Sequence, residues 1–330
     1  MDKRLSALTD RIFTHFGTTD VNLRPASSDA SFRRYFRLDH EGQTYIVMDA
    51  PPDRENTEIF VRAARQFEHI GLNVPVIIDQ DEELGFILMS DLGQVTYLER
   101  LSEGTVDRLY GDALAALIVL QSGTTLDPAY FPPYDRPLFE SEMSLFQEWY
   151  VDRHLKRRLN SDQMVMIAET FDLLCRNALE QPQVWVHRDY HSRNLMVADR
   201  NNPGILDFQD AVTGPITYDL VSLLRDCYIE WPRSRVRDWA LGYRDLAIQS
   251  GLPIAAEEDQ FLRWFDLMGL QRHIKVLGIF ARLYHRDGKP DYLGDLPLVW
   301  KYAVSVCQDH EKLRRFGALL TALEPPPCTP

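Results

Sequence analysis

Residues 184–197 read VWVHRDYHSRNLMV, a polar loop between two short apolar runs. The loop contains Asp189 and Asn194, and Asp207 lies in the next apolar run, residues 205–208. These positions fit the order H-R-D-x-x-x-x-N followed by a carboxylate on an adjacent strand. If Asp189 and Asn194 share one loop and Asp207 ends the neighbouring strand, the three side chains can converge on one point.

These three side chains suit phosphoryl transfer. The reaction needs an acceptor for the proton of the attacking hydroxyl, and oxygen ligands for the divalent cation that holds the nucleotide phosphates. Singly, Asp189 could cap a turn, Asn194 could form one, and Asp207 could pair with an arginine. Their joint occurrence in this order indicates a kinase instead. We predict Asp189 as the catalytic residue, Asn194 and Asp207 as Mg²⁺ ligands, and ATP as the phosphoryl donor.

Length and composition predict a globular protein of two lobes. At 330 residues the chain exceeds the size at which one core usually keeps growing. A net charge of −13 argues against nucleic acid or an anionic membrane as a partner. The N-terminus is charged where a signal peptide needs an apolar core, so we expect a cytoplasmic protein. Nothing in the sequence indicates an obligate protein partner.

The periodicity of apolar residues changes near residue 93. Before it, an amphipathic helix at 5–16 precedes strands and one helix, expected at 31–38, 43–49, 58–70, 74–78 and 85–89. After it the pattern is mainly helical, with helices expected at 105–121, 138–159, 162–179, 216–231, 235–249, 257–285 and 298–323. We therefore expect a nucleotide-binding lobe at 1–93 with a hinge at about 89–93, a catalytic and acceptor-binding lobe at 94–323, and a disordered tail at 324–330.

Several other chemistries lack their motifs. The chain contains no G-x-x-x-x-G-K-[ST], no G-x-G-x-x-G opening a helix, no H-E-x-x-H and no G-x-S-x-G. The four cysteines form no C-x-x-C pair. These observations exclude the P-loop, dinucleotide-binding, zincin and typical hydrolase classes, and they favour neither a zinc site nor a disulfide framework.

The motifs resemble those of the aminoglycoside phosphotransferases and related small-molecule kinases. The resemblance rests on the H-R-D and Asn194 loop, on Leu206-Asp207-Phe208 and on Tyr218-Asp219-Leu220, and it covers nearly the whole chain. It implies an α+β, bilobal, protein-kinase-like fold with a small β-rich N-lobe and a larger, mainly helical C-lobe. D-F-Q stands in place of D-F-G and no A-P-E follows, so we expect a small-molecule acceptor.

Within that family the chain is similar to the bacterial anomeric kinases of cell-wall amino sugars. The similar segments are 33–38, 47–52 and 272–282. The resemblance implies ATP-dependent phosphorylation of the C1 hydroxyl of N-acetylmuramate or N-acetylglucosamine in peptidoglycan recycling. Two alternatives stay open: a kinase of another small hydroxyl acceptor, such as an aminoglycoside or choline, and a pseudokinase that binds nucleotide without turnover.

The expected nucleotide site departs from the family pattern. Kinases of this family place a lysine on the third strand, where Met48 stands here, and Lys3 is the only lysine before Lys156. Because neighbouring strand residues point to opposite faces, one of two adjacent arginines could replace the lysine. We predict that Arg34 does, and that Arg33 faces solvent.

Further nucleotide contacts are expected from a small-residue loop and from the hinge. The loop at 27–31 replaces a glycine-rich loop and could bring backbone N–H groups to phosphate. An ordinary polar turn without a binding role explains its composition equally well. The predicted nucleotide-binding residues, with Arg34, are Ser28, Ala30, Ser31, Met89 and Asp91.

The acceptor is expected to bind within residues 225–295, which hold 11 basic and 11 acidic residues in an otherwise acidic chain. Aromatic faces beside charged groups suit a sugar that carries a carboxylate. The predicted substrate-binding residues are Arg225, Asp226, Tyr228 and Trp231. The basic residues Arg272, Lys275, Arg282 and Arg286 lie at helical spacing, and most of them are expected to form a solvated stripe.

Overall fold

The computed structural model describes residues 2–28, 32–124, 130–255 and 257–323. The described residues up to 113, with 193–210, form one compact unit, and residues 114–192 with those from 211 onward form a second. The first unit thus extends past the expected boundary at residue 93 and includes the segment that carries Asn194 and Asp207. Asp189 belongs to the second unit.

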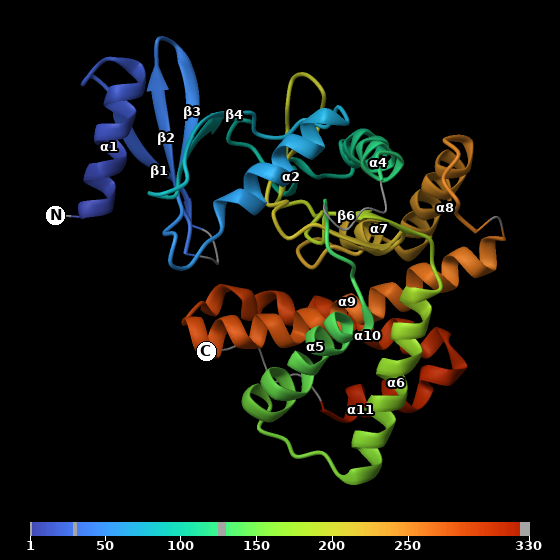
Figure 1. The fold of residues 1–330 in the computed structure, drawn as a ribbon. Helices are drawn as coiled ribbons and strands as arrows, with labels where there is room; N and C mark the ends of the chain where they lie inside the picture. Colours follow the sequence, from blue (N-terminus) through green and yellow to red (C-terminus); the bar gives the residue numbers. More distant parts are fainter. Residues whose placement is uncertain (1, 29–31, 125–129, 256, 324–330) are drawn as a thin grey trace. The chain divides into compact units, whose positions relative to one another are not determined.

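A five-stranded antiparallel sheet forms the centre of the first unit (Figure 1). Its order is β1-β2-β3-β5-β4, with bounds β1 (Asn22–Ser28), β2 (Arg34–His40), β3 (Gln43–Asp49), β4 (Ile77–Asp81) and β5 (Phe86–Ser90). β2 and β3 are the expected hairpin. β1 was not expected, because Pro25 breaks its pattern; a proline is tolerated there because β1 is an edge strand with a register shift at Pro25.

The two faces of this sheet have different surroundings. On one face, Phe36, Val47 and Leu88 pack in a core with Leu8 and Ile12 of helix α1 (Lys3–Phe16). Residues on the other face alternate with these, because strand side chains point to opposite sides in turn. That second face carries Tyr35, Ile46 and Met89, so the register fixes which side chains can reach a ligand there.

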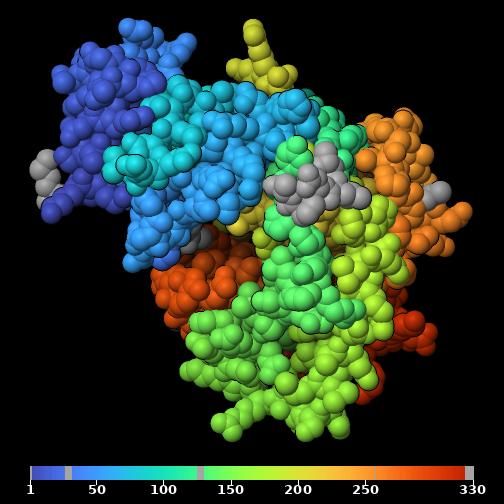
Figure 2. All heavy atoms as spheres, in the orientation of Figure 1, coloured from blue at the N-terminus to red at the C-terminus, as the bar shows by residue number. Residues whose placement is uncertain are grey.

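Segment 193–210 is attached to the first unit by backbone hydrogen bonds. Its two short strands, β7 (Leu195–Met196) and β8 (Gly204–Ile205), pair with each other. The Ile205 amide donates to the Asn73 carbonyl at 2.8 Å, just beyond helix α2 (Thr57–His69), and the Val197 amide donates to the Val95 carbonyl at 2.8 Å. The turn between β7 and β8 projects from the surface in Figure 2 (yellow). These bonds place the expected metal ligands beside the sheet.

The second unit is mainly helical. Helix α3 (Tyr97–Arg100) lies in the first unit, and α4 (Val106–Ser122) runs across the boundary at residue 113. The elements that follow are α5 (Arg136–Leu145), the π-helical η1 (Phe146–His154), α6 (Ser161–Leu179), β6 (Gln183–Val186), β9 (Val212–Pro215), α7 (Tyr218–Leu224), α8 (Arg233–Gln249), α9 (Glu258–Asp287), η2 (Pro290–Asp295), α10 (Leu296–Asp309), η3 (Glu311–Leu313) and α11 (Arg314–Leu323). Within the described residues, no helix is long and apolar enough to cross a membrane.

Three expected helices of the second unit have different bounds. The helix expected at 138–159 changes from α5 into η1 at residue 146, and the one expected at 298–323 is interrupted between α10 and α11. The helix expected at 216–231 ends at Leu224, so Arg225 caps it and Asp226 lies beyond it. Strand β9, also unexpected, pairs with β6 and supports the start of the H-R-D loop.

Helix α9 packs closely against its neighbours in the second unit. A Cβ at Gly278 would lie 2.4 Å from the carbonyl carbon of Leu145, where α5 meets η1. Real Cβ atoms do not approach backbone this closely, so only glycine lets these two segments touch. The close approach holds the middle of α9, which carries Arg272 and Lys275.

Gly278→Ala should therefore destabilise the protein by about 1–3 kcal/mol, because the added methyl must push α9 away from Leu145. Gly242→Ala is the matched control: it lies in α8 with nothing within 4 Å of an added Cβ. That change should leave stability unchanged or raise it by up to about 1 kcal/mol through helix propensity. Urea unfolding followed by tryptophan fluorescence measures both, and equal effects of the two changes would contradict the packing argument.

Candidate functional site

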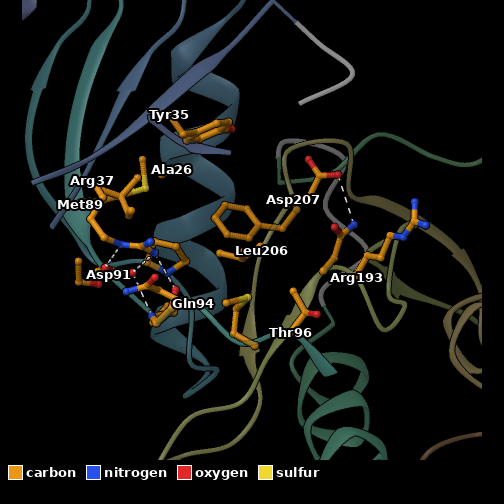
Figure 3. Close-up of a pocket in the computed structure, with 18 of the residues that line it drawn as sticks. Ala26, Tyr35, Arg37, Met89, Asp91, Gln94, Thr96, Arg193, Leu206 and Asp207 are labelled. Atoms are coloured by element: carbon orange, nitrogen blue, oxygen red, sulfur yellow. Dashed lines mark hydrogen bonds and ion pairs between the residues drawn. The ribbon is translucent and has the colours of Figure 1, made fainter. Parts of the chain in front are cut away.

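A cavity of about 430 Å³ opens within the first unit (Figure 3). One wall is the second face of the sheet, with Tyr35, Ile46 and Met89, and Leu206 contributes apolar surface from segment 193–210. The chain leaving β5, residues 90–94, also lines it. Its volume lies within the range of small-molecule sites, and apolar walls beside exposed backbone suit a flat heterocycle.

Asn194 and Asp207 also line this cavity. The Asn194 side-chain amide donates to Asp207 Oδ2 at 3.3 Å, and the Gln209 side-chain amide donates to Asp207 Oδ1 at 2.9 Å. This first bond places the Asn194 side chain directly beside the Asp207 carboxylate. An amide oxygen and a carboxylate are hard donors of the kind Mg²⁺ prefers, and Mg²⁺ commonly takes few protein ligands together with phosphate oxygens. The donor set therefore fits Mg²⁺.

The backbone at Asp207 is held in an unusual conformation. Its φ of +62° is left-handed, which aspartate tolerates better than most residues. The next residue, Phe208, is fully buried and packs on Phe60 and Phe67 of α2, with ring centroids 5.0 and 5.8 Å away. This aromatic anchor fixes the direction in which the Asp207 carboxylate leaves the chain.

An ion pair holds the connector after β5, residues 90–94, in shape. Arg37 Nε donates to Asp91 Oδ2 at 2.6 Å, and Arg37 Nη2 donates to Asp91 Oδ1 at 3.0 Å and to the Gly93 carbonyl at 2.8 Å. Asp91 also accepts from the Gly93 amide at 3.0 Å. The Asp91 side chain is only 3% exposed. Its carboxylate thus holds the connector in shape, and the connector's backbone is what borders the cavity.

In the second unit, buried cations surround the H-R-D loop. Burial alone would raise the pKa of Asp189, but Lys275, His191 and Arg188 outweigh it and lower that pKa below its ordinary value. Asp189 therefore stays ionised at neutral pH. An ionised carboxylate can orient a hydroxyl and accept its proton.

Glu142 of α5 pairs with both Lys275 and Arg188, and the ionised Asp189 supplies a second negative charge near them. Lys275 Nζ lies 3.0 Å from Glu142 Oε1 and donates to the Tyr218 hydroxyl at 3.0 Å, while Arg188 and Tyr134 also donate to Glu142. Burial opposes ionisation of Glu142, yet Lys275 and Arg188 lower its pKa. The network fixes two cations near Asp189 without leaving a buried charge uncompensated.

Two buried carboxylates hold the H-R-D loop itself. Asp219 accepts from the amides of His187 at 2.6 Å and Arg188 at 3.0 Å. Asp226 accepts from both the amide, at 2.9 Å, and the hydroxyl of Ser192. Arg188 has a left-handed φ of +76°, so these bonds offset backbone strain next to Asp189.

Comparison with known proteins decides the family. The profile of the Phosphotransferase enzyme family matches residues 22–256. The chain belongs to the phosphotransferase enzyme family. It is 47% identical over 304 residues to the N-acetylmuramate/N-acetylglucosamine kinase of Pseudomonas aeruginosa, covering 92% of this chain and 89% of that protein. It is 40% identical over 326 residues to the protein of the same name from Neisseria meningitidis, covering 97% and 96%.

Solved structures of similar fold include an aminoglycoside phosphotransferase and an ethanolamine kinase. An ADP-bound aminoglycoside phosphotransferase, APH(2'')-Ib, superposes with a TM-score of 0.61 at 16% identity, covering 93% of this chain and 99% of that one. An ethanolamine kinase from Plasmodium vivax gives 0.64 at 12% identity, covering 91% and 88%. These similarities confirm the expected α+β, kinase-like fold.

The structure corrects the expected orientation of the two adjacent arginines in this phosphotransferase. Arg34 lies on the α1 face of the sheet, where it pairs with Asp2 and Asp49. Arg33 is 9% exposed and does not face solvent; its Nη2 lies 3.8 Å from Asp207 Oδ1. Strand alternation predicts opposite faces for the two arginines, but it does not say which face α1 covers.

Of the other expected nucleotide contacts, only Met89 and Asp91 can be placed against the cavity. Both line it, Met89 with its side chain on the sheet face and Asp91 within the connector. Ser28 ends β1, but its side chain, and all of Ala30 and Ser31, lie outside the described residues.

The expected acceptor residues fall into two groups. Asp226 is fully buried and bonds to Ser192, and Arg225 pairs with Asp266 and lies over Phe265. Trp231 is 6% exposed. Tyr228 is partly exposed and packs edge-on against His191, with ring centroids 5.4 Å apart.

The structure also reveals functional candidates that the sequence interpretation missed. Arg272 and Lys275 were expected on a solvated stripe but are 4% and 7% exposed. Glu142 was not considered at all. A signal was present, because the apolar runs 267–270 and 276–281 flank these cations, and a run of six residues covers every side of a helix.

Asp219 should make the stability of this phosphotransferase depend on pH. Burial raises the pKa of Asp219 to about 7, against about 4 in the unfolded chain. The hydrogen bonds from two backbone amides oppose this rise, and the nearby Asp189 adds to it. The stabilising contribution of Asp219 is therefore complete below about pH 4 and is lost as pH rises through about 7. Relative to Asp219→Asn, which cannot titrate, the wild type should lose roughly 2 kcal/mol between pH 5 and pH 8 in urea unfolding.

The exposed Asp245→Asn serves as the control and should show no such trend. The assignment of this pKa is contradicted if the difference in unfolding free energy between wild type and Asp219→Asn stays constant or grows with pH.

Proposed function

We propose that this protein transfers the γ-phosphoryl group of ATP to the anomeric C1 hydroxyl of N-acetylmuramate or N-acetylglucosamine, in the cytoplasmic recycling of peptidoglycan sugars. One observation carries the proposal: the similarity to kinases named for these two sugars, at 40–47% identity over at least 92% of the chain. The geometry supports phosphoryl transfer, because each unit supplies one of the two functions that the reaction needs.

The cavity of the first unit would take ATP. Ile46, Met89 and Leu206 offer apolar surface to both faces of an adenine ring, and the backbone of residues 90–93 borders its edge. Backbone groups at such an edge can pair with the base without any specific side chain. Asp207 and Asn194 at the cavity wall would then meet the phosphates.

Asn194 and Asp207 would hold Mg²⁺ through the amide oxygen and the carboxylate. A bound Mg²⁺ neutralises the phosphate charge that builds up during transfer. The anchoring of Phe208 in α2 and the amide of Gln209 keep the Asp207 carboxylate in place. This chain thus supplies a positioned ligand pair, whose rigidity avoids reorganisation during the reaction.

Asp189 would orient the acceptor hydroxyl and take its proton. Only four residues separate it from Asn194, so the chain itself limits how far the proton acceptor can lie from the metal ligands. Its lowered pKa makes it a weak base. An anomeric hydroxyl is more acidic than an ordinary alcohol, so positioning by a weak base can suffice.

On the acceptor side, the partly exposed Tyr228 remains the best-placed of the predicted substrate residues. It lies against His191, two residues beyond Asp189, and its ring also stacks with Phe280 at 6.2 Å. A ring face at this position can pack on the apolar face of a sugar. We propose that Tyr228 contacts the acceptor, while Asp226 acts indirectly by holding Ser192 of the loop.

A coupled ADP-release assay tests the function. Turnover is expected with N-acetylmuramate and N-acetylglucosamine, and none with an aminoglycoside or choline. Asp189→Asn and Asp207→Ala should each lower kcat by at least about 100-fold, because the first removes the proton acceptor and the second a metal ligand. Asp199→Asn, which removes an exposed carboxylate from the same segment, is the control and should retain full activity.

Two outcomes would contradict the proposal. Turnover confined to an aminoglycoside or choline would refute the acceptor class. Near-normal turnover in Asp189→Asn or Asp207→Ala would refute the assigned roles, whichever sugar is used.

A further inference from the structure

The first unit lacks the expected strand lysine on the cavity side of its sheet. Met48 of β3 stands on that face, paired with Tyr35 and Ile87, and it is fully buried. Lys3, the only lysine before Lys156, lies in α1, which packs on the opposite face. Phosphoryl transfer from ATP needs a cation on the phosphates in addition to the metal. Another side chain must therefore supply that charge.

Among the described residues of the first unit, Arg37 and Arg193 line the cavity, and Arg33 lies beside Asp207 at its wall. Arg37 holds Asp91 and Gly93 with its guanidinium, so its charge serves the connector. Arg193 lines the cavity, but Figure 3 shows its guanidinium directed away from Leu206. Arg33 alone of the three has a guanidinium beside the Asp207 carboxylate, with Nη2 3.8 Å from Oδ1.

We propose that Arg33 is the cation that binds the nucleotide phosphates, in place of the missing lysine. This inference rests on the proposed use of ATP. It assigns to Arg33 the role first expected of its neighbour Arg34, and it adds a residue to the binding site.

The surroundings of Arg33 fit this role. Glu55 lies 3.7 Å from Arg33 Nε through Oε2, and Glu55 Oε1 accepts from the Phe32 amide at 3.1 Å. Glu55 immediately precedes Asn56, the N-cap of α2. One carboxylate at the start of this helix thus holds both the backbone before Arg33 and its guanidinium. The pairing performs the task of the lysine–glutamate pair of kinases with different residues.

The position of Arg33 also suits phosphate binding electrostatically. Asp207 would hold Mg²⁺ and with it the phosphates, and Arg33 Nη2 already lies 3.8 Å from Asp207 Oδ1, so the phosphates would come within reach of this guanidinium. The Arg33 side chain is only 8% exposed, and a charge removed from bulk water acts more strongly on its neighbours. Guanidinium offers a planar fork of donors that matches phosphate oxygens.

The test compares two adjacent arginines on opposite faces of the sheet. Isothermal titration calorimetry with Mg²⁺ present measures ADP binding, and competition measures adenosine, which lacks phosphate. Arg33→Ala should weaken ADP binding by about 10- to 100-fold and leave adenosine binding unchanged, as expected for loss of a charged hydrogen bond. Arg34→Ala, the matched control, should change ADP binding less than twofold.

Arg33→Gln guards against a folding defect in Arg33→Ala, because it keeps a donor for Glu55 and loses only the charge. It should lose ADP affinity selectively as well, while Arg33→Lys should keep most of it. Equal ADP affinity in the Arg33 and Arg34 variants would overturn the proposal. A parallel loss of ADP and adenosine binding would also overturn it, since that pattern marks a structural role.

The outcome is separable from that of the proposed function. If Arg33→Ala loses ADP selectively but no amino sugar is phosphorylated, the acceptor assignment fails and the role of Arg33 stands. If the sugars are phosphorylated and Arg33→Ala binds ADP like Arg34→Ala, the role of Arg33 fails alone.

Discussion

Two left-handed backbone positions set the direction of the carboxylates on which the chemistry depends. Arg188, next to Asp189, has a φ of +76°, and Asp207 has a φ of +62°. Such a conformation costs roughly 1–2 kcal/mol for a residue with a side chain. It persists only where the surroundings enforce it. Here the Asp219 carboxylate enforces the first position through two amides, and the burial of Phe208 in α2 enforces the second.

Positive charge is concentrated locally although the chain as a whole is acidic. The protein carries a net charge of −13, yet Lys275, Arg188 and Arg272 all act on Asp189 in the second unit. Glu142 and Asp189 together balance two of these cations, which offsets the cost of burying them. In the first unit Glu55 stands in the same relation to Arg33. An acidic protein can in this way concentrate positive charge locally within each unit.

Much of the fold could be predicted from the sequence, because its signals are local. The hairpin of β2 and β3 and most helices of the second unit follow from apolar periodicity and from glycine at the turns. β1 escaped prediction because Pro25 hides its alternation, and the end of α7 escaped because residues 225–231 contain no glycine or proline to mark it. Neither difference is visible without knowledge of the pairing partners.

The candidate site likewise combines residues that could be predicted from the sequence with residues that could not. Asp189, Asn194 and Asp207 follow from spacing alone, and the structure places the latter two on one cavity. The roles of Glu142, Arg272 and Lys275 depend on contacts distant in sequence, so spacing could not give them. Arg33 and Arg34 are an intermediate case. Alternation separated them correctly, but the choice between the two faces required knowing where α1 packs.

The central claim is that phosphoryl transfer from ATP is directed to the anomeric oxygen of an amino sugar. NMR of the product formed from ATP and N-acetylglucosamine labelled with ¹³C at C1 tests this most directly. The account predicts carbon–phosphorus coupling at C1 and disappearance of the free anomeric signals. Phosphate on another carbon, or release of ADP and inorganic phosphate without a sugar phosphate, would contradict it.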